Sequence, residues 1–256
     1  KELRSDRQIS DLRHGVPNIN GSIGFELSYG EYDSLIAAAL SGAWDEDELV
    51  AGVTVPYFSF ERHFADIGQY ELFNGCAVNK MSLDLKTNAM VTGSFDIVGK
   101  SATFGTTSAA VTNVASKTNA PLDCFSGSVK EGGAPIAVIT GVSLAVNNSI
   151  SPALVIGSKS AASLVPGRLD ITGTVSAFFE NMTLLNKFKD EIVSTLEITL
   201  GDGGPGSYII KLPKIKYSGG SNPVDGEGQI TLNMPFQALL DPTTGTNIHV
   251  TRVPMS

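Results

Sequence analysis

The chain has 256 residues, of which 42% are hydrophobic and 17% are charged, and its formal net charge is −8 at pH 7. Ordinary domains carry roughly 25% charged residues, so this composition, with its 27 glycines, is typical of a β-rich protein. It fits a protein whose surface is largely covered by neighbours, and an ordinary soluble β-rich protein is the alternative. The negative balance excludes a protein that holds nucleic acid by its phosphates, because such binding needs clustered Lys and Arg.

The cysteine content and the hydropathy pattern limit the cellular context. Two cysteines, Cys76 and Cys124, are too few for a disulfide framework. The sequence contains no signal-peptide pattern and no apolar run long enough to span a bilayer. We therefore expect that the chain is made in a reducing cytoplasm and does not associate with a membrane.

The sequence of the N-terminal part predicts an arm, a strand and a helix. Residues 1–20 are polar and contain Pro17, which is typical of an extended arm. A short strand is expected at 21–27. Ser28 and Glu31 have capping-box spacing, which predicts a helix that runs to Leu40 and ends at Gly42.

The next segments alternate with a period of two. A strand is expected at 53–64, and a hairpin is expected from 77–86 and 91–98. In the hairpin, apolar positions such as Leu83 and Phe95 alternate with polar positions such as Asp84 and Asp96. This pattern is typical of a sheet with one buried and one wet face.

The second half repeats these features after a long polar stretch. Residues 101–133 have no sustained period and are expected to form a connecting loop. Asp170 lies on the wet face of a strand expected at 169–179, and Asn181 is expected to cap a short helix. Further strands are expected at 136–147, 193–200, 208–217 and 229–236, followed by a tail rich in Pro and Gly.

Two pairs of segments suggest an internal duplication. GSIGFELSYGEYDSLIAAAL at 21–40 is similar to GTVSAFFENMTLLNKFKDE at 173–191, and MSLDLKTN with VTGSF at 81–95 is similar to VSLAVNNS with ITGTV at 142–175. The registers of the two pairs do not fit one repeat unit. We divide the chain into an N-terminal arm (1–20), a first unit (21–100), a connecting loop (101–133) and a second unit with a C-terminal tail (134–256).

The residues that usually carry catalysis are sparse. His14, His63 and His249 each lack a Cys or carboxylate at ligand spacing. The run 201–206 matches G-x-G-x-x-G, but a strand follows it instead of a helix, so it predicts a hairpin turn. The acidic run 45–48 lacks calcium-loop spacing and is expected to be a solvated loop. We expect no enzyme activity, catalytic residue, cofactor or metal.

Several stretches resemble one family. GSIGFELSYGEYDSLI, FERHFADIGQYELFNGCAVNKMSLDL, VTGSFDIVGK and GRLDITGTVSAFFENMTLLNKF are similar to the tail tube proteins of long-tailed, siphovirus-type bacteriophages. The resemblance implies a mainly β chain with the β-sandwich tail-tube fold and short flanking helices. It also implies a structural virion protein whose stacked rings form the hollow tail tube for genome passage. Related tubes of contractile tails and of type VI secretion share this architecture, but the quoted stretches favour a flexible tail.

The resemblance also implies partners and a location. Six units surround the channel in related rings, so a duplicated chain would form a trimer with pseudo-sixfold symmetry, and a hexamer of single-unit chains is the alternative. Tape-measure and tail-end proteins would be partners, and DNA would pass without specific binding. The chain would assemble in the host cytoplasm and reside in the virion. The arm 1–20 and the loop 101–133 are candidates for contacts between rings.

The wet strand faces suggest the residues that line such a channel. We expect Asp84, Asp96 and Asp170 among the lumen-facing residues, and the outer surface is the alternative position for them. Three chains at −8 give −24 per ring, and a negative wall repels DNA phosphates over the screening length of about 8–10 Å.

A second class of function remains open on the sequence alone. A β-sandwich module that binds carbohydrate or a receptor, in a phage or cell-surface protein, would expose aromatic side chains along a groove. Trp44 is the only tryptophan and lies just after the expected helix, so the sequence favours the tube.

Overall fold

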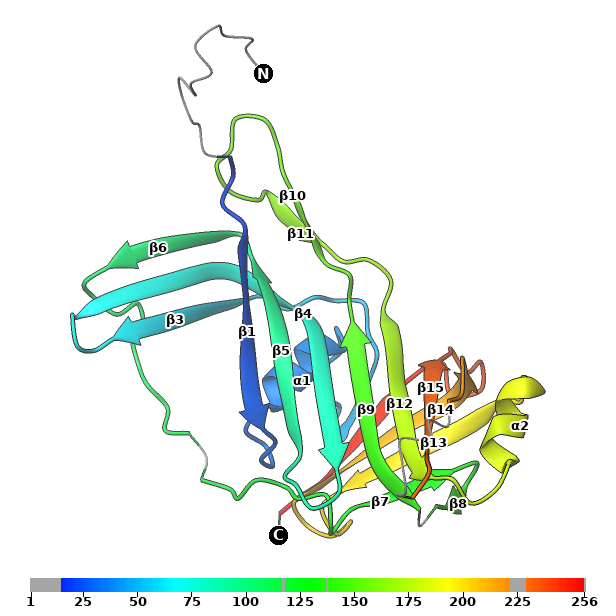
Figure 1. The fold of residues 1–256 in the computed structure, drawn as a ribbon. Coiled ribbons are helices and arrows are strands. Elements are labelled where there is room, and N and C mark those ends of the chain that lie inside the picture. The colour runs from blue at the N-terminus through cyan, green and yellow to red at the C-terminus, as the bar shows by residue number, and fades with distance from the viewer. Residues whose placement is uncertain (1–14, 117, 137, 222–228, 256) are drawn as a thin grey trace, which may run out of the picture.

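The computed structural model describes residues 15–116, 118–136, 138–221 and 229–255. Within these ranges, fourteen strands join in one sheet, two more form a separate hairpin, and two short helices flank the sheet (Figure 1). The expected mainly β, sandwich-like fold with short helices is confirmed. Among the described residues, neither helix is long and apolar enough to cross a membrane.

The first half of the chain forms one helix and a set of strands around the long strand β4. Residues 77–86 of β4 lie inside the main sheet, and its residues 69–76 extend into a separate arm with two short strands. The elements are β1 (Ile19–Glu26), α1 (Asp33–Ala39), β2 (Glu48–Val50), β3 (Phe58–Phe64), β4 (Gln69–Lys86), β5 (Thr92–Gly99) and β6 (Ser101–Gly105).

The second half begins with short strands and ends with long ones. Its elements are β7 (Ser128–Glu131), β8 (Ala134–Pro135), β9 (Ile139–Asn147), β10 (Ser151–Ala153), β11 (Ser163–Val165), β12 (Asp170–Phe178), α2 (Thr183–Lys189), β13 (Ser194–Leu200), β14 (Ser207–Tyr217), β15 (Thr231–Ala238) and β16 (His249–Val253).

The sheet folds over its own buried face. One layer runs in the order β1-β5-β4-β9-β12-β15, and the sheet continues through β14 and β13, with β16 and β2 joined to β14. Side chains of both parts share one buried cluster, for example Phe95 and Leu144 from the first layer and Ile198 and Leu212 from the second. Residues of α1, including Ile36, belong to the same cluster, so the helix packs inside the sandwich.

The period-two pattern of β4 gives the layer its two faces. Met81, Leu83 and Leu85 are 2%, 3% and 8% exposed, whereas Ser82 and Asp84 between them are partly exposed. The predicted hairpin with one buried and one wet face is confirmed, because β4 and β5 pair in antiparallel register.

The two halves share one order of elements and one set of strand pairings. Apart from β2, which lies between α1 and β3 and has no counterpart between α2 and β13, the order is β1, α1, β3, β4, β5 and β6 in the first half and β12, α2, β13, β14, β15 and β16 in the second. β1 pairs with β5, and β4 pairs with β5, β3 and β6. In the same way, β12 pairs with β15, and β14 pairs with β15, β13 and β16.

The registers of the two sets are compatible with the first pair of similar segments. Gly21 lies opposite Ile97, which lies opposite Val78. Gly173 lies opposite Phe236, which lies opposite Tyr217. Ile97, Val78, Phe236 and Tyr217 are all buried, so both glycines lie on the core-facing side of their strands, which is compatible with the alignment of Gly21 with Gly173 in the first pair of similar segments. β3 and β13 both shift register near their first residues as well.

The second pair of similar segments has a different basis. It aligns β4 and β5 with β9 and β12. In that alignment β12 corresponds to β5, whereas in the shared pairing pattern β12 corresponds to β1. In both places a glycine lies under an aromatic ring: a Cβ at Gly93 would be 2.5 Å from Phe25 Cζ, and one at Gly173 would be 2.4 Å from Phe236 Cζ. The shared T-G pattern thus reflects a local packing need, and the domain boundaries at 21–100 and 134–256 stay a prediction.

The expected capping box is wrong. Ser28 forms an isolated bridge with Pro121, and α1 begins only at Asp33, with no side-chain cap at Tyr32. Ser41 has a positive φ of 50° at the helix end. Gly42 is needed for close approach, because a Cβ there would lie 2.3 Å from the Val50 carbonyl oxygen.

The segment 101–133 and the C-terminal tail contain strands that the sequence pattern did not predict. β6 and β7 lie inside the expected loop, and β16 lies inside the expected tail. These strands have only four or five residues of weak alternation and are held by pairing with longer neighbours. The arm 1–20 lies mostly outside the described residues, and its last two residues already belong to β1.

Candidate functional site

One side of the first layer carries an almost continuous set of small polar and charged side chains, here called the polar face. Cross-strand neighbours share a face of a sheet, so the registers define its rows. The rows are Glu26, Thr92, Asp84, Ser143 and Thr174; then Gly24, Ser94, Ser82, Ala145, Thr172 and Gln237; and then Ser22, Asp96, Lys80, Asn147 and Asp170.

The three aspartates expected to line a channel all lie on this polar face. Asp96 on β5 and Asp170 on β12 belong to the same row, which also contains Lys80 and Asn147. Asp84 lies four residues beyond Lys80 on β4, and therefore on the same side. All three aspartates are partly exposed. The structure thus brings together residues that are up to 86 positions apart in the sequence.

Hydrogen bonds hold the polar face in one arrangement. Gln237 Nε2 donates to Asp170 Oδ1 at 2.7 Å, and the Ser82 and Ser94 hydroxyls lie 2.8 Å apart. A shallow depression of about 350 Å³ crosses β4, β9, β12 and β15 between these residues. The face offers short, fixed polar groups and no large apolar platform on which a ligand could stack.

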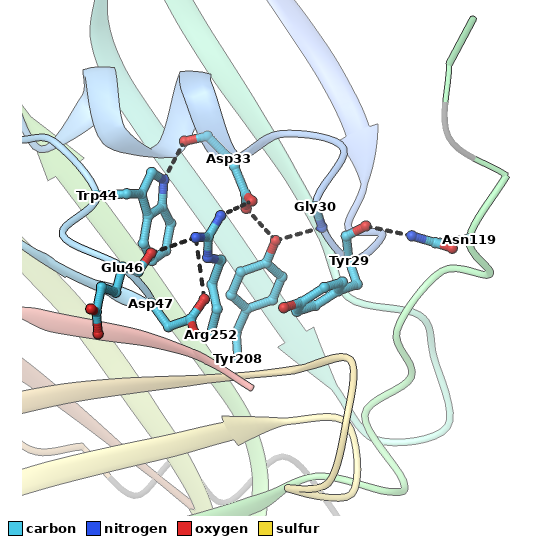
Figure 2. A network of polar contacts seen from close by, with 9 residues as sticks. All are labelled: Tyr29, Gly30, Asp33, Trp44, Glu46, Asp47, Asn119, Tyr208 and Arg252. Carbon is cyan, nitrogen blue, oxygen red and sulfur yellow. Dashed lines mark hydrogen bonds and ion pairs between the residues drawn. The ribbon is translucent and has the colours of Figure 1, made fainter. Parts of the chain in front are cut away.

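A second polar cluster joins the two halves of the chain (Figure 2). Arg252 on β16 donates from Nη1 to Asp33 Oδ2 at 2.6 Å and from Nη2 to the Glu46 carbonyl at 2.6 Å. Its guanidinium also lies 4.3 Å from the centre of the Trp44 ring. We call the residues Asp33, Trp44, Tyr208 and Arg252 the Asp33 network.

Tyr208 completes the Asp33 network from the neighbouring strand. It lies directly opposite Arg252 in the pairing of β14 with β16. Its hydroxyl donates to Asp33 Oδ1 at 2.5 Å and accepts from the Gly30 N–H at 2.7 Å. Trp44 Nε1 donates to the Asp33 carbonyl at 2.9 Å. Asp33 therefore links the start of α1 to two strands of the second half.

The electrostatics suit a structural link and not proton transfer near neutral pH. Burial raises the pKa of Tyr208 far above its ordinary value, and the hydrogen bond to Asp33 raises it further. Burial has the largest single effect and lowers the pKa of Arg252, but the hydrogen bond to Asp33 and the charges of Asp33 and Asp47 together outweigh it, and the net shift is upward. The phenol thus stays protonated and the guanidinium stays charged, which is the state the contacts require.

Other candidate residues do not assemble into a reactive site. Within the described part of the chain, no three His, Cys, Asp or Glu residues lie close enough to hold a metal ion. His249 Nε2 lies 3.3 Å from Glu48 Oε2, a contact that the sequence spacing could not reveal, and His14 lies outside the described residues. Gly201–Gly206 forms the expected turn between β13 and β14.

The acidic run 45–48 is more structured than expected. Glu48 begins β2, and Asp47 Oδ1 lies 3.2 Å from Arg252 Nη2. The prediction of a simple solvated loop is therefore wrong for these two residues. Sequence reasoning also missed Arg252, because its partner Asp33 lies 219 positions away.

The β-rich sandwich and its large polar face suit a structural protein. A comparison with protein families agrees, because the sequence model of the phage tail tube proteins matches residues 1–238. The chain belongs to the phage tail tube protein family. It has a structural role in the tail tube and is part of the virion tail. A comparison with curated proteins gives no match.

Proposed function

We propose that three copies of this chain form a ring of six sandwich units, and that stacked rings form the hollow tube for genome passage. The shared pairing pattern of the two halves is the observation that carries this proposal. Two matching units per chain supply six positions with three chains. A hexamer of chains would instead place twelve such units in each ring.

The edge of β1 supports the ring. β12 lies between β9 and β15, whereas its counterpart β1 pairs only with β5 among the described strands. An open edge strand is a liability that proteins normally cover. A neighbouring chain in a closed ring would add a strand beside β1, in the place that β9 occupies beside β12.

The polar face is the best candidate for the channel wall. The opposite face of the layer is buried in the core, so it cannot meet the channel. The rows of the polar face carry four carboxylates, Glu26, Asp84, Asp96 and Asp170, against Lys80, and Lys86 lies on the same side of β4 one row further, opposite Gly141. Short polar groups with a negative balance repel DNA phosphates and give the bases no aromatic surface for stacking.

The wider setting follows from the family. The chain would assemble in the host cytoplasm, around a tape-measure protein that sets tube length and onto proteins at the tail end. The carbohydrate-binding alternative is not favoured, since one face of the Trp44 indole is covered by Arg252 and is not available to a sugar.

Native mass spectrometry of isolated rings, with end-on electron microscopy of tubes, tests the proposal. Rings of three chains with six lobes around a central hole are expected. Six chains per ring would overturn the trimer but keep the tube. Failure of the chain to form rings or tubes at any concentration, even with its tail-end proteins, would contradict the tube itself.

A further inference from the structure

The hairpin β10–β11 exposes three consecutive aliphatic side chains at one end of the molecule. Leu154, Val155 and Ile156 are 58%, 52% and 106% exposed, and we call them the hairpin tip. Consecutive exposed apolar residues are unfavourable in water unless they serve a function. Figure 1 shows this hairpin beyond the end of β9.

The hairpin is ordered enough to act as a fixed projection. At its base, Ile150 and Leu164 pack with Ala77 in a small buried cluster. Ala162 N donates to the Ala153 carbonyl at 2.9 Å, and Ser158 Oγ donates to the Ser160 carbonyl at 2.7 Å. The hairpin tip is therefore displayed on a base that its own contacts hold in place.

A mainly apolar pocket lies at the start of β9, at the opposite end of that strand from the hairpin. Its volume is about 360 Å³, and its apolar lining includes Leu85, Cys124, Val129, Ile136, Ile139 and Val142. We call it the end pocket. A cavity of about 150 Å³ lined by aliphatic and aromatic side chains can hold benzene, so the end pocket has room for more than one aliphatic side chain.

The surroundings of the end pocket also favour an apolar partner. Met90 and Phe125 are 45% and 74% exposed; Met90 bridges to Asp123 and Phe125 follows Cys124, and both Asp123 and Cys124 line the pocket. Lys86 and Asp123 give the lining one charge of each sign. Lys159, exposed near the hairpin tip, can pair with Asp123 of another chain.

The positions of these two features indicate how they meet. β9 starts at the end pocket with Ile139 and ends at Asn147, three residues before Ile150 at the hairpin base. Nine residues of strand span about 30 Å, so one chain cannot fill its own pocket with its own tip. A contact between different patches of identical chains is head-to-tail and can continue without closing.

We propose that the hairpin tip of one chain docks in the end pocket of a chain in the next ring. This proposal rests on the proposed function and names the contact that stacks the rings. Each ring of three chains makes three such contacts with the ring above it and three with the ring below. Burial of exposed aliphatic surface is the main stabilising contribution, and the Lys159–Asp123 pair helps to set the orientation.

The first test replaces the most exposed residue of the hairpin tip. Ile156→Asp puts a carboxylate where an apolar pocket would receive it, and burial of an unpaired charge is costly. Mean tube length in electron micrographs should fall by at least about tenfold, with rings retained. Ile67→Asp is the matched control, because Ile67 is 64% exposed in the turn between β3 and β4, outside both features and outside the segments 1–20 and 101–133, and its tubes should have normal length.

A disulfide test keeps the proposal falsifiable if Ile156→Asp disturbs the hairpin. Cys124 lines the end pocket and Cys76 is buried. In Ile156→Cys tubes, an added oxidant such as diamide should remove one hydrogen from each thiol and link successive rings, giving a ladder on non-reducing gels. Cys124→Ser in the same background should abolish the ladder, and Ile67→Cys should give none.

The outcomes separate this proposal from the proposed function. Normal tubes from Ile156→Asp, or no ladder from intact Ile156→Cys tubes, would overturn the docking of tip in pocket and leave the tube unaffected. If the unmodified chain forms rings of three that never stack, the docking proposal is also overturned. Absence of rings from the unmodified chain would instead count against the proposed function.

Discussion

Arg252 Nη1 lies 2.6 Å from Asp33 Oδ2 and joins residues that are 219 positions apart. Asp33 is the first residue of α1 in the first half of the chain, and Arg252 lies in the last strand. The contact is mostly shielded from solvent, since the two side chains are 22% and 16% exposed. It therefore stabilises the position of the first half against the second.

Removal of this ion pair should lower the stability of the chain. Arg252→Ala leaves Asp33 shielded and without its charged partner, and charged hydrogen bonds of this kind contribute about 1.5–3 kcal/mol each. We expect a loss of about 2 kcal/mol in the free energy of unfolding, measured by urea denaturation. Arg62→Ala is the control, because Arg62 pairs with Glu71 at the same 2.6 Å but is 61% exposed, and it should cost less than about 1 kcal/mol. Equal losses in both variants would contradict the structural role of Arg252.

Tyr208 should make the protein sensitive to alkaline pH. Its pKa is raised in the folded chain, first by burial and then by Asp33, so the unfolded chain loses the phenolic proton first as pH rises above about 10. The stabilisation is complete below that pH and falls above it, by at most about 1.4 kcal/mol per pH unit for one proton. Tyr208→Phe should be less stable at pH 7 but should show a shallower loss between about pH 10 and 12. Denaturation midpoints across this range measure the slope, and an unchanged slope would count against the assignment.

The two glycines under aromatic rings should resist substitution. A Cβ at Gly173 would lie 2.2 Å from the Ser143 carbonyl oxygen as well as against Phe236, and backbone cannot move away without breaking the sheet. We expect Gly173→Ala to cost about 3 kcal/mol or more, at the upper end for overpacking, and Gly93→Ala to behave alike. Gly21→Ala is the control, since nothing lies within 4 Å of its Cβ position. Thermal unfolding measures all three, and a stable Gly173→Ala chain would contradict the packing described.

Charge reversal on the polar face should hinder DNA passage. Replacement of Asp84, Asp96 and Asp170 by Lys should leave tubes intact but slow or block genome ejection, because a positive wall attracts phosphates. Phage particles carrying the variant would be tested by ejection of DNA in vitro. Asp66, Glu180 and Asp190, which are exposed elsewhere, give a control with the same change of net charge and unchanged ejection. Equal ejection by both variants would place the polar face outside the channel.

Long alternating strands were predictable because their pattern records burial directly. In residues 81–86 of β4 and in β12, core-facing and partly exposed positions alternate, so the sequence alone predicted strands there, the wet face and the side on which Asp84 and Asp170 lie; it did not predict residues 69–76 of β4. Gly21 and Gly173, which the similarity of the first pair of segments aligns, both lie on the core-facing side of their strands. For such elements, local sequence and tertiary structure impose the same pattern.

The features that the sequence did not predict are those whose structure depends on tertiary contacts. β16 forms because β14 offers an edge to His249–Val253, although its local sequence resembles a tail; the alternation of Ile248 and Val250 is the only signal. Ser28 matches a capping box, yet its backbone bridges to Pro121. The Asp33 network and the end pocket each bring together residues from distant segments of the chain. The spacing of residues within one segment cannot predict such contacts.

A cryo-electron microscopy map of tubes assembled from this chain tests the central claim most directly. The account predicts three chains in each ring, a strand of the neighbouring chain along the free edge of β1, and Asp84, Asp96 and Asp170 facing the channel. A ring of six chains, or a map with the polar face on the outer surface of the tube, would contradict it.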